Sequence, residues 1–232
     1  MWAGRRFHGW HPDMSVEAIT KDYFQKALDA NRVWDFGNDV LYTLCRDHPN
    51  HDDAAQIVAK TWLIGRSYAV SLERRSGLEV DSDVLYVKHI VPIFQNAGLD
   101  QRLKNFTPQR KRTASSSLAL HKILVDALGE IGEEARRSFA SKYLHFHCPE
   151  HFFIYDSRAA ASARKLAGRL DRRDKRRMSS EDCDPGHSED CDPDYADFFY
   201  RCERLTRCLA LTIGRSPTPR ELDKLLLFHH AQ

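Results

Sequence analysis

The stretch SKYLHFHCPEHFFIYDS, residues 141–157, decides how the chain is organised. Aromatic and histidine residues fill its centre, with Lys142 near its start and Asp156 near its end. Asp156 precedes SRAAASARKL, a sequence that forms helix readily, so its carboxylate is placed to cap that helix. Two interpretations remain open: a surface lysine followed by a helix cap, or an amine nucleophile and its carboxylate partner. The aromatic neighbours of Lys142 favour burial, and burial leaves more of a lysine in its neutral, nucleophilic form.

Helical patterns extend outward from this stretch on both sides. Apolar residues recur at i, i+3 and i+4 along most of the chain, and nothing alternates strands with helices in a βαβ rhythm. The segment TPRELDKLLLFHH begins with Thr218, Pro219 and Glu221, the pattern of a capping box. The sequence therefore predicts an all-α fold of eight to ten helices. The expected helical ranges are 15–30, 34–47, 52–75, 83–98, 115–129, 133–147, 156–168, 194–212 and 218–230.

Two of these helices carry further signals. In 83–98, Pro92 predicts a kink or a split, and Gly98 predicts a glycine cap at the end. In 52–75, apolar residues cover nearly every side, which is typical of a central buried helix. Arg66 and Glu73 lie about two turns apart on that predicted helix and need not pair with each other. Arg66 either takes part in an ion pair between lobes or reaches a phosphate or base edge in a cleft.

The chain of 232 residues is long enough for one large domain or two packed lobes. We expect a single all-α domain over 1–232, with 45–170 as the core that carries the motif and 194–232 as terminal helices. Between them, 171–193 contains SEDCDP twice, and such acidic repeats with Pro and Gly are typical of flexible insertions.

Composition restricts the class of protein. The net charge is only +2, so basic stripes such as RKR at 110–112 matter more than the total. No apolar run approaches the roughly 20 residues of a membrane span, and the first residues lack a signal-peptide core. The six cysteines are scattered without a CxxC pair, which disfavours a disulfide framework. We therefore expect a cytoplasmic protein with no membrane partner.

His145, His147, Cys148 and His151 crowd one short segment and suggest a metal site at first sight. On a helix, however, positions 145 and 147 point roughly 200° apart and cannot share an ion. No second ligand pair occurs at a familiar spacing. We therefore predict no metal and no cofactor, and interpret the histidines as pocket-lining or capping groups.

The residues SFASKYLHFHCPEHFFIYDSRA, together with WLIGRSYAVSLER, resemble the helix-hairpin-helix glycosylase superfamily. Within it, the bacterial 8-oxoguanine DNA glycosylase-like branch is most similar, whose members accompany antiphage operons of the CBASS type. The resemblance implies a two-lobed helical glycosylase fold. The hairpin would be degenerate, because RRSFASK carries none of the glycines of the family motif.

By this resemblance, Lys142 would be the nucleophile and Asp156 the catalytic carboxylate of an N-glycosylase and abasic-site lyase acting on a modified or damaged base. The expected partners are a nucleic acid or a modified nucleobase or nucleotide, and other proteins of an antiviral operon. The alternative is a catalytically altered module that binds such a base, a nucleotide or a partner protein without cleavage. The predicted binding residues are Arg66, Arg112, His145, His147, Tyr155, Ser157 and Arg158.

Overall fold

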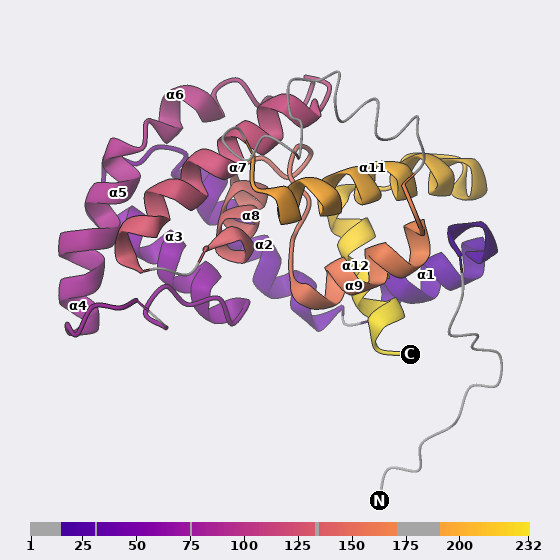
Figure 1. Cartoon of the computed structure of the whole chain (residues 1–232), viewed down its shortest axis with the longest axis horizontal. Helices are drawn as coiled ribbons and strands as arrows, with labels where there is room; N and C mark the ends of the chain where they lie inside the picture. The colour runs from indigo at the N-terminus through magenta and orange to yellow at the C-terminus, as the bar shows by residue number, and fades with distance from the viewer. Residues whose placement is uncertain (1–14, 31, 75, 133–134, 171–190) are drawn as a thin grey trace, which may run out of the picture.

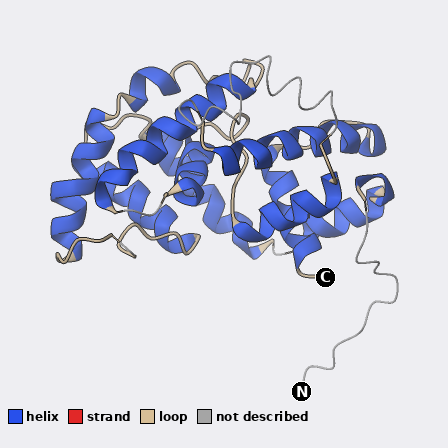
Figure 2. Cartoon of the chain, viewed as in Figure 1, coloured by secondary structure: helices blue, strands red, loops and turns tan. Residues whose placement is uncertain are grey.

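The computed structural model of the protein describes residues 15–30, 32–74, 76–132, 135–170 and 191–232. All regular elements within these ranges are helical, which confirms the all-α prediction (Figures 1 and 2). The predicted flexible insertion lies almost wholly outside the described residues. The elements are η1 (Val16–Ala18), α1 (Lys21–Asp29), α2 (Val33–Asp47), α3 (Ala54–Ser67), α4 (Ser82–Val84), η2 (Leu85–Ile90), α5 (Val91–Asn96), α6 (Leu99–Leu103), α7 (Ala114–Leu128), η3 (Gly129–Ile131), α8 (Arg137–His147), α9 (Ser157–Ala167), α11 (Pro193–Ile213) and α12 (Pro219–His230).

Local signals set several helix ends as predicted. Thr218 Oγ1 accepts the Glu221 N–H at 3.2 Å, and Glu221 Oε2 accepts the Thr218 N–H at 2.9 Å, which completes the capping box of α12. Pro92 lies at the start of α5, directly after the π-helical turn η2. Gly98 follows the end of α5 with a φ of +62°, a left-handed conformation that glycine adopts without strain.

The prediction of one long buried helix over 52–75 is wrong. α3 ends at Ser67, and Trp62 on it is 43% exposed. The chain turns back after α3 because the Val70 N–H donates to Gly65 O at 2.8 Å. A Cβ at Gly65 would lie 3.2 Å from Ser71 Cα, so the missing side chain allows the returning segment to pack against the helix. The pattern of apolar residues in the sequence does not predict this turn.

Buried apolar side chains form two clusters, which define two lobes. The α8 lobe is built on α2, α3, α5, α7 and α8, and the α12 lobe on α1, α9, α11 and α12 (Figure 1). Phe152 belongs to the core of the α8 lobe and Phe153 to that of the α12 lobe. The extended segment between α8 and α9 therefore crosses from one lobe to the other, which brings Lys142 and Asp156 to the boundary between them.

Ion pairs also join the two lobes. Asp35 on α2 accepts the Lys224 amine at 2.8 Å and lies 3.4 Å from the Arg220 guanidinium, both on α12. All three charged groups are at least partly shielded from water, which strengthens such pairs relative to fully exposed ones. Within the described ranges, no helix is both long enough and apolar enough to cross a bilayer.

Candidate functional site

Lys142 lies in the middle of α8 and is 1% exposed. Its Nζ donates to Tyr155 O at 2.5 Å and to Ser138 Oγ at 2.9 Å, with Ser138 O at 3.4 Å. The amine therefore lies inside the protein, bound to neutral oxygen atoms. Of the two interpretations left open by the sequence, the surface lysine is therefore wrong, and Lys142 is buried among its aromatic neighbours.

The backbone of Tyr155 is held firmly against α8. Its N–H donates to Ser141 Oγ at 3.0 Å, and its carbonyl accepts the Ser138 hydroxyl at 3.0 Å. Ser138, Ser141 and Lys142 lie on one face of the helix because residues three and four apart are neighbours on its surface. This face sets where the extended segment ends and where the next residue, Asp156, begins α9.

Asp156 caps α9 as the sequence predicts. Its Oδ1 accepts the Ala159 N–H at 2.8 Å, and its Oδ2 lies 3.6 Å from the Arg158 guanidinium. Among the interactions of these described residues, no hydrogen bond joins the Asp156 carboxylate to the Lys142 amine. The carboxylate nevertheless acts on that amine through its charge. Asp156 can thus be a helix cap and an electrostatic partner at once.

Burial lowers the pKa of Lys142 to about 8, because the charged ammonium loses its hydration. The carboxylates of Asp156 and Asp223 oppose this effect and raise the pKa. At pH 7.5 a group with a pKa of 8 is neutral in roughly a quarter of the molecules. A neutral amine is therefore present at physiological pH in an enclosed site.

Asp223 is a residue that the sequence reasoning missed. It lies on α12, is 2% exposed, and pairs through Oδ2 with the Arg220 guanidinium at 2.5 Å. Its other oxygen, Oδ1, is buried and has no hydrogen-bond partner. Burial raises the pKa of Asp223 to about 6, while Arg220 and Lys142 lower it. In the sequence, this aspartate is an ordinary charged residue of an amphipathic helix, so no local signal distinguishes it.

Tyr68 lies near Lys142 and holds a second buried polar group, Asn38. The Lys142 Nζ lies 5.5 Å from the centre of the Tyr68 ring, and the Tyr68 hydroxyl donates to Asn38 Oδ1 at 2.8 Å. The Asn38 Nδ2 is buried and has no partner. The charges of Asp223 and Arg220 also act on Tyr68, whose pKa burial raises. A free acceptor and a free amide donor thus occur in the surroundings of Lys142.

His145 and His147 belong to different surroundings, in line with their opposite directions on a helix. His145 shares a hydrogen bond with the Tyr42 hydroxyl at 2.6 Å and another with Phe152 O at 2.8 Å. His147 stacks on His51 at 5.2 Å, and its Nε2 has no partner. Within the described ranges, no three His, Cys, Asp or Glu side chains are grouped to hold a metal ion.

Arg66 and Glu73 form an ion pair at 2.5 Å, which the sequence left open. The turn after α3 brings the two together, which a continuous helix would not. The Arg66 guanidinium also lies over the Trp62 ring at 5.7 Å and is largely exposed. Arg66 therefore lies on the surface of α3, and its nucleic-acid contact stays a prediction.

The other predicted binding residues lie at different depths. Arg112 pairs with Glu203 on α11 at 2.7 Å, and its guanidinium lies over the Phe153 ring at 4.3 Å. Arg112 therefore joins the segment before α7 to α11 and to the segment between α8 and α9. Ser157 and Arg158 are exposed in the first turn of α9. The Tyr155 ring is half-buried against Phe198. The charge of Asp156 acts on Lys142 and that of Lys142 on His145, whereas Arg66, Arg112 and His147 have other neighbours.

Comparison with known proteins gives no family model, no curated protein and no solved structure that matches this chain.

Proposed function

We propose that the protein is an 8-oxoguanine DNA glycosylase-like enzyme that removes a modified or damaged base and then cleaves the abasic strand as a lyase. The enclosed amine of Lys142, with a pKa lowered to about 8, is the observation that carries this proposal. A nucleophilic lysine needs to be neutral, and burial supplies that condition without a dedicated base. The assignment to antiviral defence rests on the family resemblance alone.

The chemistry begins with the lone pair of the neutral amine. A neutral amine has two N–H donors, and Tyr155 O and the Ser138 oxygens lie where they can accept both. The lone pair attacks C1′ of the sugar, the glycosidic bond breaks, and the departing base takes a proton. Loss of the amine proton and opening of the sugar give a Schiff base, from which β-elimination expels the 3′ phosphate.

Two carboxylates assist this reaction in different ways. Asp156, at the N-terminus of α9, stabilises the positive charge that develops on the sugar. Asp223 has a pKa raised to about 6, which suits a group that exchanges protons near neutral pH. Its unpartnered Oδ1 can accept a hydrogen bond from a bound base, and the unpartnered Asn38 Nδ2 can donate one.

The packing of α7 against α8 supports the resemblance to a helix-hairpin-helix unit. The two helices are joined by residues 129–136, of which 133–134 lie outside the described residues. A base must be extruded from its strand to reach an enclosed amine, and the pocket must open to receive it. The ion pairs of Asp35 with α12 join the two lobes. We propose that these pairs break and the lobes move apart when a base enters.

Borohydride trapping tests this proposal. The protein is incubated with single- and double-stranded oligonucleotides that contain 8-oxoguanine or an abasic site, and sodium borohydride reduces any Schiff base to a stable covalent complex. We expect a complex with the native chain and its loss in Lys142→Ala. Lys122→Ala is the matched control, because Lys122 is a lysine on α7 whose amine is paired with Asp126 at 2.6 Å. Absence of any trapped complex, or equal trapping by Lys142→Ala, contradicts the enzyme proposal.

A binding module without cleavage is the second candidate, and the tight enclosure of Lys142 favours it. The amine has oxygen partners on α8 and on the extended segment, so a free base can bind beside it while the covalent step never occurs. Calorimetry with purine and deazapurine bases separates the two candidates. A module titrates with the free base and releases nothing from an oligonucleotide, whereas the enzyme releases base from the strand.

A further inference from the structure

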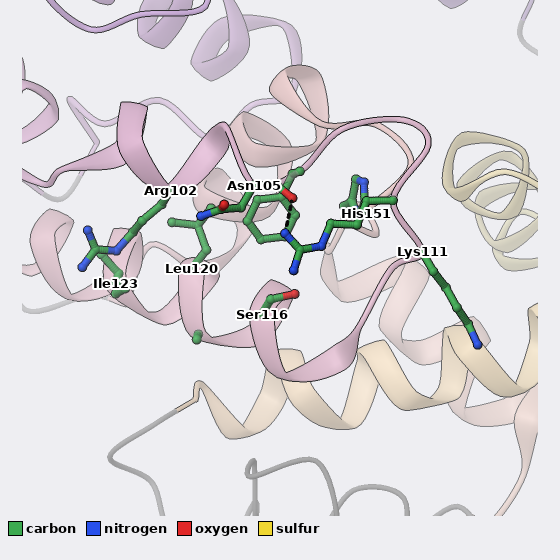
Figure 3. A pocket seen from close by; sticks show the side chains of 10 residues that line it. Arg102, Asn105, Lys111, Ser116, Leu120, Ile123 and His151 are labelled. Atoms are coloured by element: carbon green, nitrogen blue, oxygen red, sulfur yellow. Dashed lines mark hydrogen bonds between the residues drawn. The ribbon is translucent and has the colours of Figure 1, made fainter.

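A cavity of about 340 Å³ lies beside the start of α7, and Lys142 is not among its lining residues (Figure 3). Cationic, polar and apolar side chains line it together, and none of the ten residues that line it is a carboxylate. This volume falls at the lower end of the range for small-molecule sites. The lining residues are Arg102, Asn105, Phe106, Arg110, Lys111, Ser116, Ala119, Leu120, Ile123 and His151.

The cations of this cavity are not neutralised by the described part of the protein. Arg110 donates one N–H to Asn105 O at 3.2 Å, the hydrogen bond drawn in Figure 3, and Arg102 donates one to Gly98 O at 3.3 Å. Both bonds go to neutral carbonyls. No ion pair joins Arg102, Arg110 or Lys111 to a carboxylate within the described ranges. Most of the guanidinium donors are therefore available to an anion.

Other lining residues are apolar. Leu120 and Ile123 lie one turn apart on α7, and Phe106 packs its ring against His151 at 5.2 Å. Figure 3 shows Arg102 beside Ile123 at one end of the cavity and Lys111 at the other, with Asn105 and Ser116 between them. Phe106 and Ile123 are half-buried, so a ligand that carries an apolar part beside its anionic group would cover more of their surface.

The start of α7 adds positive potential on the same side. Thr113 precedes the helix without a side-chain cap bond, and its hydroxyl is bound to Ser116 Oγ at 2.5 Å instead. The first turn carries no acidic residue. The positive end of the helix dipole is therefore not compensated where Ser116 lines the cavity.

We propose that this cavity binds a nucleoside phosphate, with the phosphate held by Arg110 and its neighbouring cations and the base against Phe106, Leu120 and Ile123. Arginine binds phosphate oxygens through paired N–H donors, and a flat base covers apolar side chains. A free nucleotide and the 5′-phosphorylated end of a strand offer the same chemistry. The proposal does not depend on the chemistry of Lys142.

Calorimetric titration of the full chain with adenosine monophosphate, guanosine monophosphate, inorganic phosphate and adenosine tests this proposal. We expect saturable binding of the monophosphates, weaker binding of inorganic phosphate and none of the nucleoside. Arg110→Gln and Arg102→Gln should each weaken the monophosphate by about tenfold. Lys104→Gln is the matched control, since Lys104 is a cation of the same loop that lines a different cavity. It should change the affinity less than about twofold.

The source of the ligand is resolved with two short single strands that differ only in a 5′ phosphate or a 5′ hydroxyl. Preference for the phosphorylated strand over the mononucleotide identifies a strand end, and the reverse identifies a free nucleotide. Lys142→Ala should retain all of this binding, so failure of the enzyme proposal would leave this one intact. No saturable binding in the millimolar range would overturn the proposal. So would equal losses in Lys104→Gln and Arg110→Gln, or a nucleoside that binds as tightly as its monophosphate.

Discussion

Lys60 and Lys142 are both fully enclosed lysines of the α8 lobe, and burial lowers the pKa of both amines. The Lys60 Nζ donates to His48 O at 2.9 Å and Asn50 O at 3.0 Å, where α2 ends. It supplies donors to carbonyls that a helix end leaves unpaired, and its charge opposes the negative end of the helix dipole. Lys60 is thus explained by structure alone.

Lys142 differs in what surrounds it. Carboxylate charges act on both amines, those of Asp100 and Asp52 on Lys60 and those of Asp156 and Asp223 on Lys142. Near Lys142, however, Asp223 itself keeps one buried oxygen without a partner, and the buried amide nitrogen of Asn38 has no partner either. A buried polar atom without a hydrogen-bond partner destabilises the fold. Such an atom therefore needs an explanation, and a role in binding a ligand is one. Burial of a lysine therefore says little about function by itself, and the proposed base site rests on the unpartnered groups near Lys142 as well.

The largest expected effect is the pH dependence of base release. The nucleophile is the neutral amine, and with a Lys142 pKa of about 8 its population rises about 50-fold between pH 6 and pH 8. The single-turnover rate should rise by a similar factor and then level off. A rate that still rises tenfold for each pH unit up to pH 10 would indicate a lysine with an ordinary pKa. Lys142 would then titrate like a lysine on the surface.

Asp223 allows the surroundings of Lys142 to be tested through the free energy of unfolding. Its pKa is raised from 3.8 to about 6, so between these values the folded chain binds more protons than the unfolded chain. The free energy of unfolding should therefore fall as pH rises through this window, by on the order of 2 kcal/mol from this residue. Asp223→Asn should remove that decline. Urea unfolding of both chains at pH 4, 5 and 6 measures it, and parallel pH profiles would contradict the assignment.

Replacement of each buried lysine by methionine compares the two sites directly. Lys60→Met leaves the carbonyls of His48 and Asn50 without a donor and should cost about 1.5 kcal/mol of unfolding free energy. In Lys142→Met, Tyr155 O keeps its bond from Ser138, so the change should stay below about 1 kcal/mol. Urea midpoints at pH 7 give both values. Equal losses would mean that Lys142, too, is held for structure.

We expect the smallest change in the free energy of unfolding at Arg66, which lies outside the surroundings of Lys60 and of Lys142 and therefore serves as a control. Its pair with Glu73 is on the surface, where the guanidinium side chain is 54% exposed. Arg66→Gln should change the free energy of unfolding by less than about 0.5 kcal/mol, since exposed pairs contribute little. Thermal unfolding in low and high salt measures this. A loss as large as that in Lys60→Met would show that the pair supports the turn after α3.

Local sequence was sufficient for the features that depend on neighbouring residues. The capping box at Thr218, the cap at Asp156 and the glycine after α5 all occur as predicted. The early end of α3 was not predictable in the same way. The apolar pattern continues past Ser67, and only the contact of Gly65 with the returning chain explains the turn.

Thus the amino-acid sequence by itself determined an all-helical chain, its main helix ends, and the placement of Lys142 and Asp156 on either side of one crossing segment. Only the tertiary structure decided that Asn38, Tyr68 and Asp223 share the surroundings of that lysine, because they come from segments far apart in the chain. The physical reason is solvation. Charge, pairing and pKa depend on which atoms replace water around a group, and those atoms are assembled only when the two lobes pack together.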